Sequence, residues 1–215
     1  MLRALRQSES LLFDLGREAA PLRARDLCLL LVASAALYGL CMGAFRLSPD
    51  RAVLLVYVAV KVPILIALTT ILCLPGYFVL NSVLGLRRDL GIALRAILAG
   101  QAALTASLAS LAPITLFVYA CGVSHRHALL FNAAMFTIAT ALGQIILLRR
   151  YRPLVRANQR HRFMLWTWVT LYAFVGIQLG WMLRPFVGSP NMPVRFLRDE
   201  PFSNAYVVVL RLIFG

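Results

Sequence analysis

The stretch AVLLVYVAVKVPILIALTTILCL, residues 52–74, decides the fold of this chain. It is apolar over a length that, as a helix, crosses the roughly 30 Å hydrocarbon core of a bilayer. Near its middle stands Lys61, the only lysine of the protein, two residues before Pro63. A charged side chain at that depth is costly in lipid and usually faces protein or water instead. The stretch therefore predicts a transmembrane helix that needs other helices around Lys61.

The rest of the chain offers such neighbours. Of its 215 residues, 61% are hydrophobic, the mean hydropathy is +0.80, and the apolar residues come in blocks of about twenty, a bilayer-spanning length. This composition excludes an ordinary soluble domain. We predict an all-α fold, a polytopic transmembrane helix bundle with about five spans. The expected spans are residues 27–45, 52–74, 96–120, 128–148 and 163–183.

The segments that flank the spans have a different character. Residues 1–26 are basic, and we expect a cytoplasmic amphipathic lead-in at the interface. Its apolar face at three- and four-residue spacing is Leu5, Ser8, Leu12, Leu15, Ala19 and Leu22. A cleaved signal peptide is the alternative, but the first apolar run is short for one. Residues 184–215 are expected to form an extracytoplasmic or interfacial tail, because the apolar run 202–214 is too short to span. Pro75 and Gly76 are expected to end or kink the second helix.

The charge is strongly positive. The net charge is +14, from 21 arginines and one lysine against eight acids. The arginines flank apolar blocks, a pattern that favours contact with anionic lipid headgroups and argues against nucleic acid. The segments on one predicted side, residues 3–25, 87–95 and 149–162, hold the excess, so we expect a cytoplasmic N-terminus and an outside C-terminus. The excess of arginine over lysine is typical of GC-rich bacteria, and we expect a bacterial inner membrane.

Small residues recur at four-residue spacing on three of the expected spans, which is typical of close helix packing. For the last pair a homodimer face is the alternative to packing within the chain. The residues are Ala35, Gly39 and Gly43, then Ala99, Ala103 and Ser107, and finally Gly176 and Gly180.

Polar side chains inside the expected spans form a candidate intramembrane site. No Asp or Glu lies in any span, so Lys61 depends on neutral groups, water, an outside anion or the loss of its proton. The structural hypothesis is a hydrogen bond to the Ala59 carbonyl that Pro63 leaves without a donor, or to a neighbouring amide. The functional hypothesis is a polar cavity that binds an anion. The amide residues are Gln101, Asn132, Gln144 and Gln178.

Catalytic and metal-binding motifs are absent from the sequence. Four cysteines lie in or beside apolar blocks without CxxC spacing, which favours buried thiols over disulfides or metal ligands. His125 and His127 flank Arg126, and we interpret them as part of a plain interfacial loop. We expect no enzymatic activity, no cofactor and no metal.

Two segments are candidates for contact with a partner or with lipid. One is the basic loop after the fourth span, and the other is the proline-rich segment after the fifth. Their leading residues are Arg149, Arg150 and Arg152 in the first, and Arg184, Pro185 and Phe186 in the second.

The layout of residues 27–183 resembles the Yip1 type of integral membrane protein, which has five closely packed spans and a cytoplasmic N-terminus. The eukaryotic signature strings of that family are not present, so the resemblance implies no GTPase-binding residue. We expect a non-catalytic scaffold or accessory subunit of a larger membrane assembly, with lipids, other membrane subunits or a second copy as partners. The alternative is a small channel or carrier with an anion-preferring pathway past Lys61, Gln101 and Gln178.

Overall fold

A computed structural model describes residues 24–47, 52–188 and 196 of the chain. The described residues are helical and turn structure with no strand. Five of their helices are long and apolar enough to cross a membrane, which confirms the predicted all-α bundle of five spans. The elements are α2 (Ala24–Gly43), α3 (Ala52–Val83), the short 3-10 helix η2 (Arg87–Asp89), α4 (Leu90–Ala120), α5 (His125–Ala157) and α6 (Arg160–Met182).

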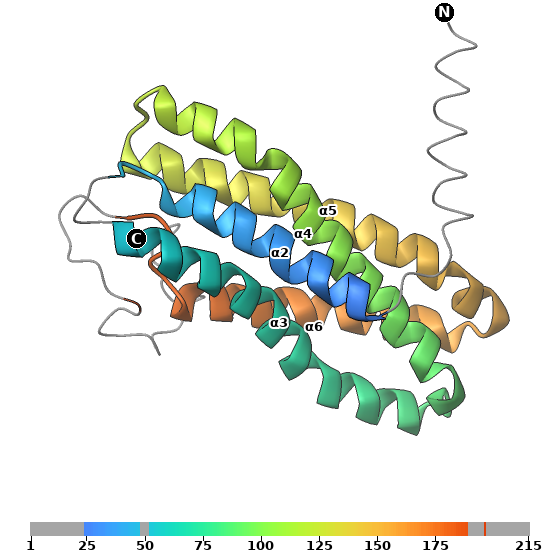
Figure 1. Ribbon diagram of the computed structural model, residues 1–215. Coiled ribbons are helices and arrows are strands. Elements are labelled where there is room, and N and C mark those ends of the chain that lie inside the picture. Colours follow the sequence, from blue (N-terminus) through green and yellow to red (C-terminus); the bar gives the residue numbers. More distant parts are fainter. Residues whose placement is uncertain (1–23, 48–51, 189–195, 197–215) are drawn as a thin grey trace, which may run out of the picture.

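The helices pack side by side in an order that differs from their order in the chain. α2 lies between α3 and α4, α5 packs on the other side of α4, and α6 packs on α3 (Figure 1). The lateral order is therefore α5–α4–α2–α3–α6. α5 and α6 stand at the two ends of this row and contact each other only sparsely.

Three helices are longer than the sequence predicts. α3 continues through both Pro63 and Pro75 and ends only at Val83. The prediction allowed either an end or a kink at Pro75, and the end is wrong. At 32 residues α3 is about 48 Å long, well beyond the hydrocarbon core. The end itself has a local cause: Gly85 has a φ of +74°, and the Leu86 N–H donates to the Asn81 carbonyl across it.

The same extension lengthens α4 and α5 at the arginine-rich end of the bundle. α4 begins at Leu90 and α5 runs to Ala157, where the sequence predicts residues 96 and 148. These extra turns contribute to a second hydrophobic cluster that includes Tyr151 and Trp168, separate from the cluster around Tyr38 and Val58. Packing on neighbours therefore holds the helices beyond the apolar blocks.

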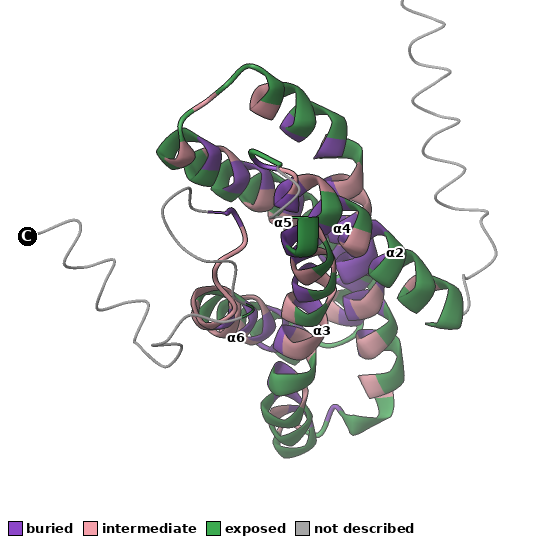
Figure 2. Ribbon diagram, turned by 60° about the vertical axis from the view of Figure 1, so that its left-hand side comes forward, coloured by how far each residue is buried: buried purple, intermediate pink, exposed green. Residues whose placement is uncertain are grey.

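Burial follows the helix faces. Buried residues lie on the faces that the helices turn toward one another, and the outward faces are exposed (Figure 2). The outward faces carry many large apolar side chains, such as Leu29, Val56 and Phe117. Such exposed apolar faces match a lipid surrounding rather than water. The lead-in up to residue 23 and nearly all of the tail beyond residue 188 lie outside the described residues.

Candidate functional site

Lys61 is fully buried and bonds to the segment that follows α6. Its Nζ donates to the Pro185 carbonyl oxygen at 2.9 Å. The ammonium also lies 4.9 Å from the centroid of the Phe196 ring and 5.9 Å from that of Phe186. A carbonyl acceptor and two aromatic faces are a neutral environment that suits a buried cation. The partner of Lys61 is therefore neither the Ala59 carbonyl nor an amide side chain.

The intramembrane amides do not gather around Lys61. Asn132 accepts from the Tyr38 hydroxyl at 3.0 Å, and its Nδ2 donates to the Ala128 carbonyl at 2.7 Å and to the Tyr119 hydroxyl. These bonds join α2, α4 and α5 at a distance from Lys61.

The glutamines occupy other places in the bundle. Gln101 accepts from the Tyr172 hydroxyl at 2.7 Å, which joins α4 to α6. Gln144 lines a cleft described below, and its buried Oε1 has no hydrogen-bond partner among the described residues. Gln178 is half-buried on α6. Of the polar residues that the sequence groups as one site, Lys61, Gln101 and Asn132 thus lie in separate contacts.

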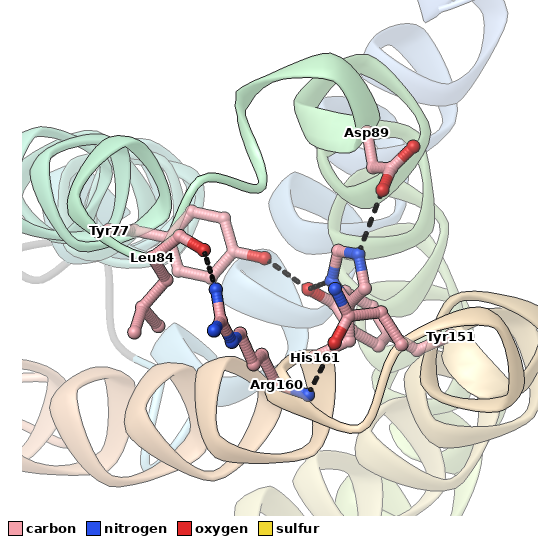
Figure 3. Close-up of polar contacts among 7 residues, drawn as sticks. Tyr77, Leu84, Asp89, Tyr151, Arg160 and His161 are labelled. Atoms are coloured by element: carbon pink, nitrogen blue, oxygen red, sulfur yellow. Dashed lines mark hydrogen bonds and ion pairs between the residues drawn. The ribbon is translucent and has the colours of Figure 1, made fainter.

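A different polar group joins four elements at the arginine-rich end. His161, in the first turn of α6, is fully buried, and its Nε2 lies 3.0 Å from Asp89 Oδ2. The Tyr151 hydroxyl of α5 lies 3.4 Å from His161 Nδ1 and 2.6 Å from the Tyr77 hydroxyl of α3 (Figure 3). We call Asp89, His161, Tyr151 and Tyr77 the interface chain.

The chemistry of these groups gives the interface chain a direction. An ionised Asp89 can only accept, so the hydrogen of its bond to His161 is on Nε2. In a neutral imidazole Nδ1 then accepts from Tyr151, and Tyr151 in turn accepts from Tyr77. In this arrangement each of the three hydrogen bonds has one donor and one acceptor. Both hydroxyls and the imidazole are buried and only Asp89 of the four is partly exposed, so these bonds join helices in the interior of the bundle.

Two further bonds support the same corner. The Arg160 guanidinium donates to the Leu84 carbonyl at 3.1 Å, which links α6 to the turn after α3 (Figure 3). The Arg160 backbone N–H donates to Asn158 Oδ1 at 3.0 Å, so Asn158 satisfies one of the amide groups at the start of α6.

The sequence does not reveal the interface chain as long as acids are considered only within the expected spans. Asp89 is the only acid between Asp50 and Asp199. It lies just before one apolar block, and His161 just before another, on the same side of the predicted bundle. That pairing is the signal that could have found it. Of the histidines singled out instead, His127 is locally bonded: its Nδ1 lies 2.7 Å from Oγ of Ser124, the residue that caps α5.

The described residues contain no group of three or more His, Cys, Asp or Glu side chains with metal-binding geometry. Arg149, Arg150 and Arg152 are exposed at the arginine-rich end. At the opposite end, the Arg184 guanidinium stacks 3.5 Å from the ring centroid of Trp181.

The small residues of α2 lie against the backbone of α3. A Cβ added to Gly39 would come within 2.5 Å of the Val58 carbonyl oxygen, and one added to Gly43 within 3.0 Å of Leu55 Cα. Ala35, one turn earlier on the same face, is fully buried.

The remaining small residues differ among themselves. Ala99 is buried on α4, whereas Ala103 and Ser107 are half-buried. A close contact of α4 lies at Gly100, which is not among the small residues predicted to pack. A Cβ added to its neighbour Gly143 on α5 would lie 2.8 Å from the Gly100 carbonyl oxygen.

Gly176 and Gly180 on α6 do not mark a close helix contact within the chain. A Cβ on Gly176 would lie 3.5 Å from Thr69 Cγ2, an ordinary distance, and one on Gly180 would meet nothing within 4 Å. The expected packing of this pair within the chain is therefore wrong at Gly180.

Gly176 and Gly180 instead line a cleft of about 1050 Å³. Its walls are α5 and α6, with parts of α3 and α4 and the segment 181–187. Most of its lining is apolar, with Gln144 and Tyr172 among the polar exceptions. We call it the α5–α6 cleft.

Comparisons with protein-family models, with curated proteins and with solved structures found no match. The fold and its contacts therefore define the protein at this level: it is an integral membrane protein with five candidate transmembrane helices within the described residues.

Proposed function

We propose that the protein is a non-catalytic scaffold or accessory subunit of a larger membrane assembly. The observation that carries this proposal is the environment of Lys61. The one lysine in a span is fully buried and donates to Pro185 in the same chain, so the charge holds the segment after α6 in place. The interior contacts serve the fold, which leaves the outward faces and the two ends for interaction with other molecules.

The alternative, an anion pathway past Lys61, has less support. Lys61 donates to Pro185 and Gln101 accepts from Tyr172, and aromatic rings flank the ammonium. The α5–α6 cleft, which could hold solvent or solute, does not include Lys61 in its lining. A flux assay in liposomes with the native protein and with Lys61→Met tests this alternative, and we expect no flux from either.

We further propose that the arginine-rich end faces the cytoplasm of a bacterium. The exposed Arg149, Arg150 and Arg152 follow the positive-inside pattern. Their side chains would contact anionic headgroups or an acidic partner there. The resemblance to the Yip1 type stays a prediction from layout.

Extraction in a mild detergent or in native nanodiscs, followed by native mass spectrometry, tests the proposed function. We expect the chain to travel with another membrane protein, or with a second copy, at fixed stoichiometry. A variant with Arg149, Arg150 and Arg152 all changed to Gln should weaken a partner bound at that end, and Arg126→Gln at the opposite end is the matched control. A lone monomer under every extraction condition would contradict the proposal.

A further inference from the structure

The interface chain continues to one more buried polar group. Asn81 lies one turn beyond Tyr77 on α3 and is fully buried, and its side chain interacts with the Tyr77 hydroxyl. The Asn81 Oδ1 has no hydrogen-bond partner among the described residues. Its Nδ2 donates to the Tyr77 backbone carbonyl over 3.4 Å, a long bond that lets the amide turn its oxygen toward the hydroxyl. Buried acceptors in native proteins are nearly always paired, so this oxygen calls for a physical reason.

The line of groups from Asp89 to Asn81 is one hydrogen short. It has four polar contacts, and each needs one hydrogen. A neutral imidazole supplies one hydrogen and the two hydroxyls supply one each, which makes three. The 2.6 Å contact between the hydroxyl oxygens cannot lack its hydrogen, because bare oxygens repel each other at that distance. With the bond direction described above, the contact without a hydrogen is the one at Asn81 Oδ1. Turning Tyr151 and Tyr77 the other way only transfers the shortfall to His161 Nδ1.

A fourth proton completes the line. If it binds Nδ1 of His161, both ring nitrogens donate, Nε2 to Asp89 and Nδ1 to Tyr151. Tyr151 then donates to Tyr77, and the Tyr77 hydroxyl donates to Asn81 Oδ1. The bonds beyond His161 reverse their direction, and each of the four contacts holds one hydrogen. The contact of 3.0 Å between the imidazole and Asp89 becomes a charge-assisted bond, which is stronger than a neutral one.

The charges around His161 are one carboxylate in contact and several exposed cations. Asp89 on η2 touches the ring, and 41% of its side chain is exposed, which gives the ring a route to water. α5 contributes the neutral Tyr151, and α3 contributes Tyr77 behind it. The cations near these residues in the chain are exposed arginines, so water and salt screen their repulsion. They are Arg87 and Arg88 on η2, Arg95 on α4, Arg150 and Arg152 on α5, and Arg160 and Arg162 on α6.

We propose that His161 is a proton-binding site, and that proton uptake reverses the interface chain and tightens the joint between α3, η2, α5 and α6. Histidine is the side chain that ordinarily changes charge between pH 5 and 8. The folded chain gives the added proton and the hydroxyls buried acceptors that the unfolded chain does not hold in place. The stabilisation is therefore present on the acid side of the His161 titration and is lost as the pH rises through it. This site does not depend on whether the protein belongs to a larger assembly.

The first test observes the proton itself, in the full chain in nanodiscs with ¹⁵N-labelled histidine. Solid-state NMR distinguishes the two neutral tautomers and the imidazolium by the shifts of the ring nitrogens. With His125→Gln and His127→Gln, His161 is the only histidine left in the chain. We expect hydrogen on Nε2 alone at about pH 8 and on both ring nitrogens at about pH 5. Hydrogen on Nδ1 alone at the higher pH, or a ring still neutral at the lower pH, would overturn the proposal.

Hydrogen exchange of the unaltered chain measures the tightening of the joint. The amides to follow are that of His161, which donates to the Asn158 carbonyl, and that of Leu86, which donates to the Asn81 carbonyl. After correction for the intrinsic pH dependence of exchange, their protection should rise about tenfold from about pH 8 to about pH 5. This is the value of one charge-assisted hydrogen bond. Protection that is equal at the two pH values, or lower at the acid one, contradicts the proposed tightening.

Variants assign the pH response to the site. His161→Gln keeps a donor for Asp89 and an acceptor for Tyr151 but takes up no proton, so protection should no longer change with pH. Asn81→Leu removes the last acceptor of the line and should also abolish the rise. If Asn81→Leu does not fold, Tyr77→Phe replaces it, because it leaves the reversed Tyr151 hydroxyl without an acceptor. His127→Gln, at the opposite end of α5, is the matched control and should keep the tenfold rise. A full rise in folded His161→Gln would show that another group binds the proton and would overturn the assignment.

Discussion

Two glycine pairs with the same spacing have opposite surroundings in this molecule. Gly39 and Gly43 on α2 lie so close to α3 that an added Cβ would meet its backbone at 2.5 to 3.0 Å. Gly176 and Gly180 on α6 border the α5–α6 cleft, where a Cβ on Gly180 would meet nothing within 4 Å. The spacing gives a helix a flat face in both cases, but only one of the two faces has a helix against it.

The difference shows that the position of a helix in the row decides whether another helix packs against its small-residue face. α2 has neighbours on both sides, so its face is pressed against α3. α6 stands at the end of the row and touches α5 only sparsely. The interface chain joins α5 to α6 at one end, whereas at the other end Lys61 of α3 binds the segment that follows α6.

The largest effect is expected for Gly39→Leu. The new side chain would collide with the Val58 carbonyl, a backbone atom that cannot move aside, and should force α2 away from α3. We expect the free energy of unfolding to fall by about 3 kcal/mol. Titration with SDS in mixed micelles measures it. A loss no greater than that of Gly180→Leu would break the comparison.

Asp89→Ala should give the next largest loss. It leaves the buried Nε2–H of His161 without an acceptor, which costs about 2 kcal/mol in the same unfolding titration. Asp89→Asn retains a side-chain oxygen that can accept, so it should recover roughly half of this loss. Equal losses for the two variants would show that the bond to His161 does not support the end of the α5–α6 pairing.

Lys61→Met should have a smaller effect on stability. The variant removes the donor to Pro185 but also removes a costly buried charge, so the net loss is expected to be about 1 kcal/mol. The local effect is larger: backbone amides at Val187 and Gly188 should exchange hydrogen faster, as measured by mass spectrometry. Lys61→Arg, which keeps the charge, is the control. Unchanged exchange in Lys61→Met would mean that the segment is held by other contacts.

Gly180→Leu should have the smallest effect. Its side chain enters open space, and leucine favours a helix more than glycine does, so unfolding should change by about 0.5 kcal/mol or less, toward higher stability. The same titration as for Gly39→Leu measures it. A large loss would show that α5 closes on α6 in the bilayer, and that the two glycine faces are alike after all.

Sequence reasoning predicts the bundle well because each span is an apolar block of bilayer length. It does not predict that α3 runs through Pro75 to Val83, since the burial of Tyr77 and Asn81 that sustains the extra turns depends on neighbouring helices. It identifies Lys61 as a residue in need of a partner. It does not identify Pro185 as that partner, because every residue has a backbone carbonyl and the sequence does not show which one lies near Lys61.

The limits are similar for the rest of the candidate site. Asn132 bonds to two tyrosines, and Tyr38 lies 94 residues away along the chain. Such partners follow from the lateral order of the helices, which hydrophobic periodicity does not encode. The same order brings Asp89 and His161 together. It also places Gly39 against the backbone of α3 and Gly180 beside the α5–α6 cleft.

The bond between Lys61 and Pro185 also has a consequence for synthesis. The two residues are 124 positions apart. At ordinary translation rates, about 6 to 25 s pass between the emergence of one and the emergence of the other. During that interval α3 is in or near the membrane with a lysine that lacks its final acceptor. Lys61 is therefore synthesised well before its acceptor, and a nascent chain that stops before Pro185 lacks that acceptor.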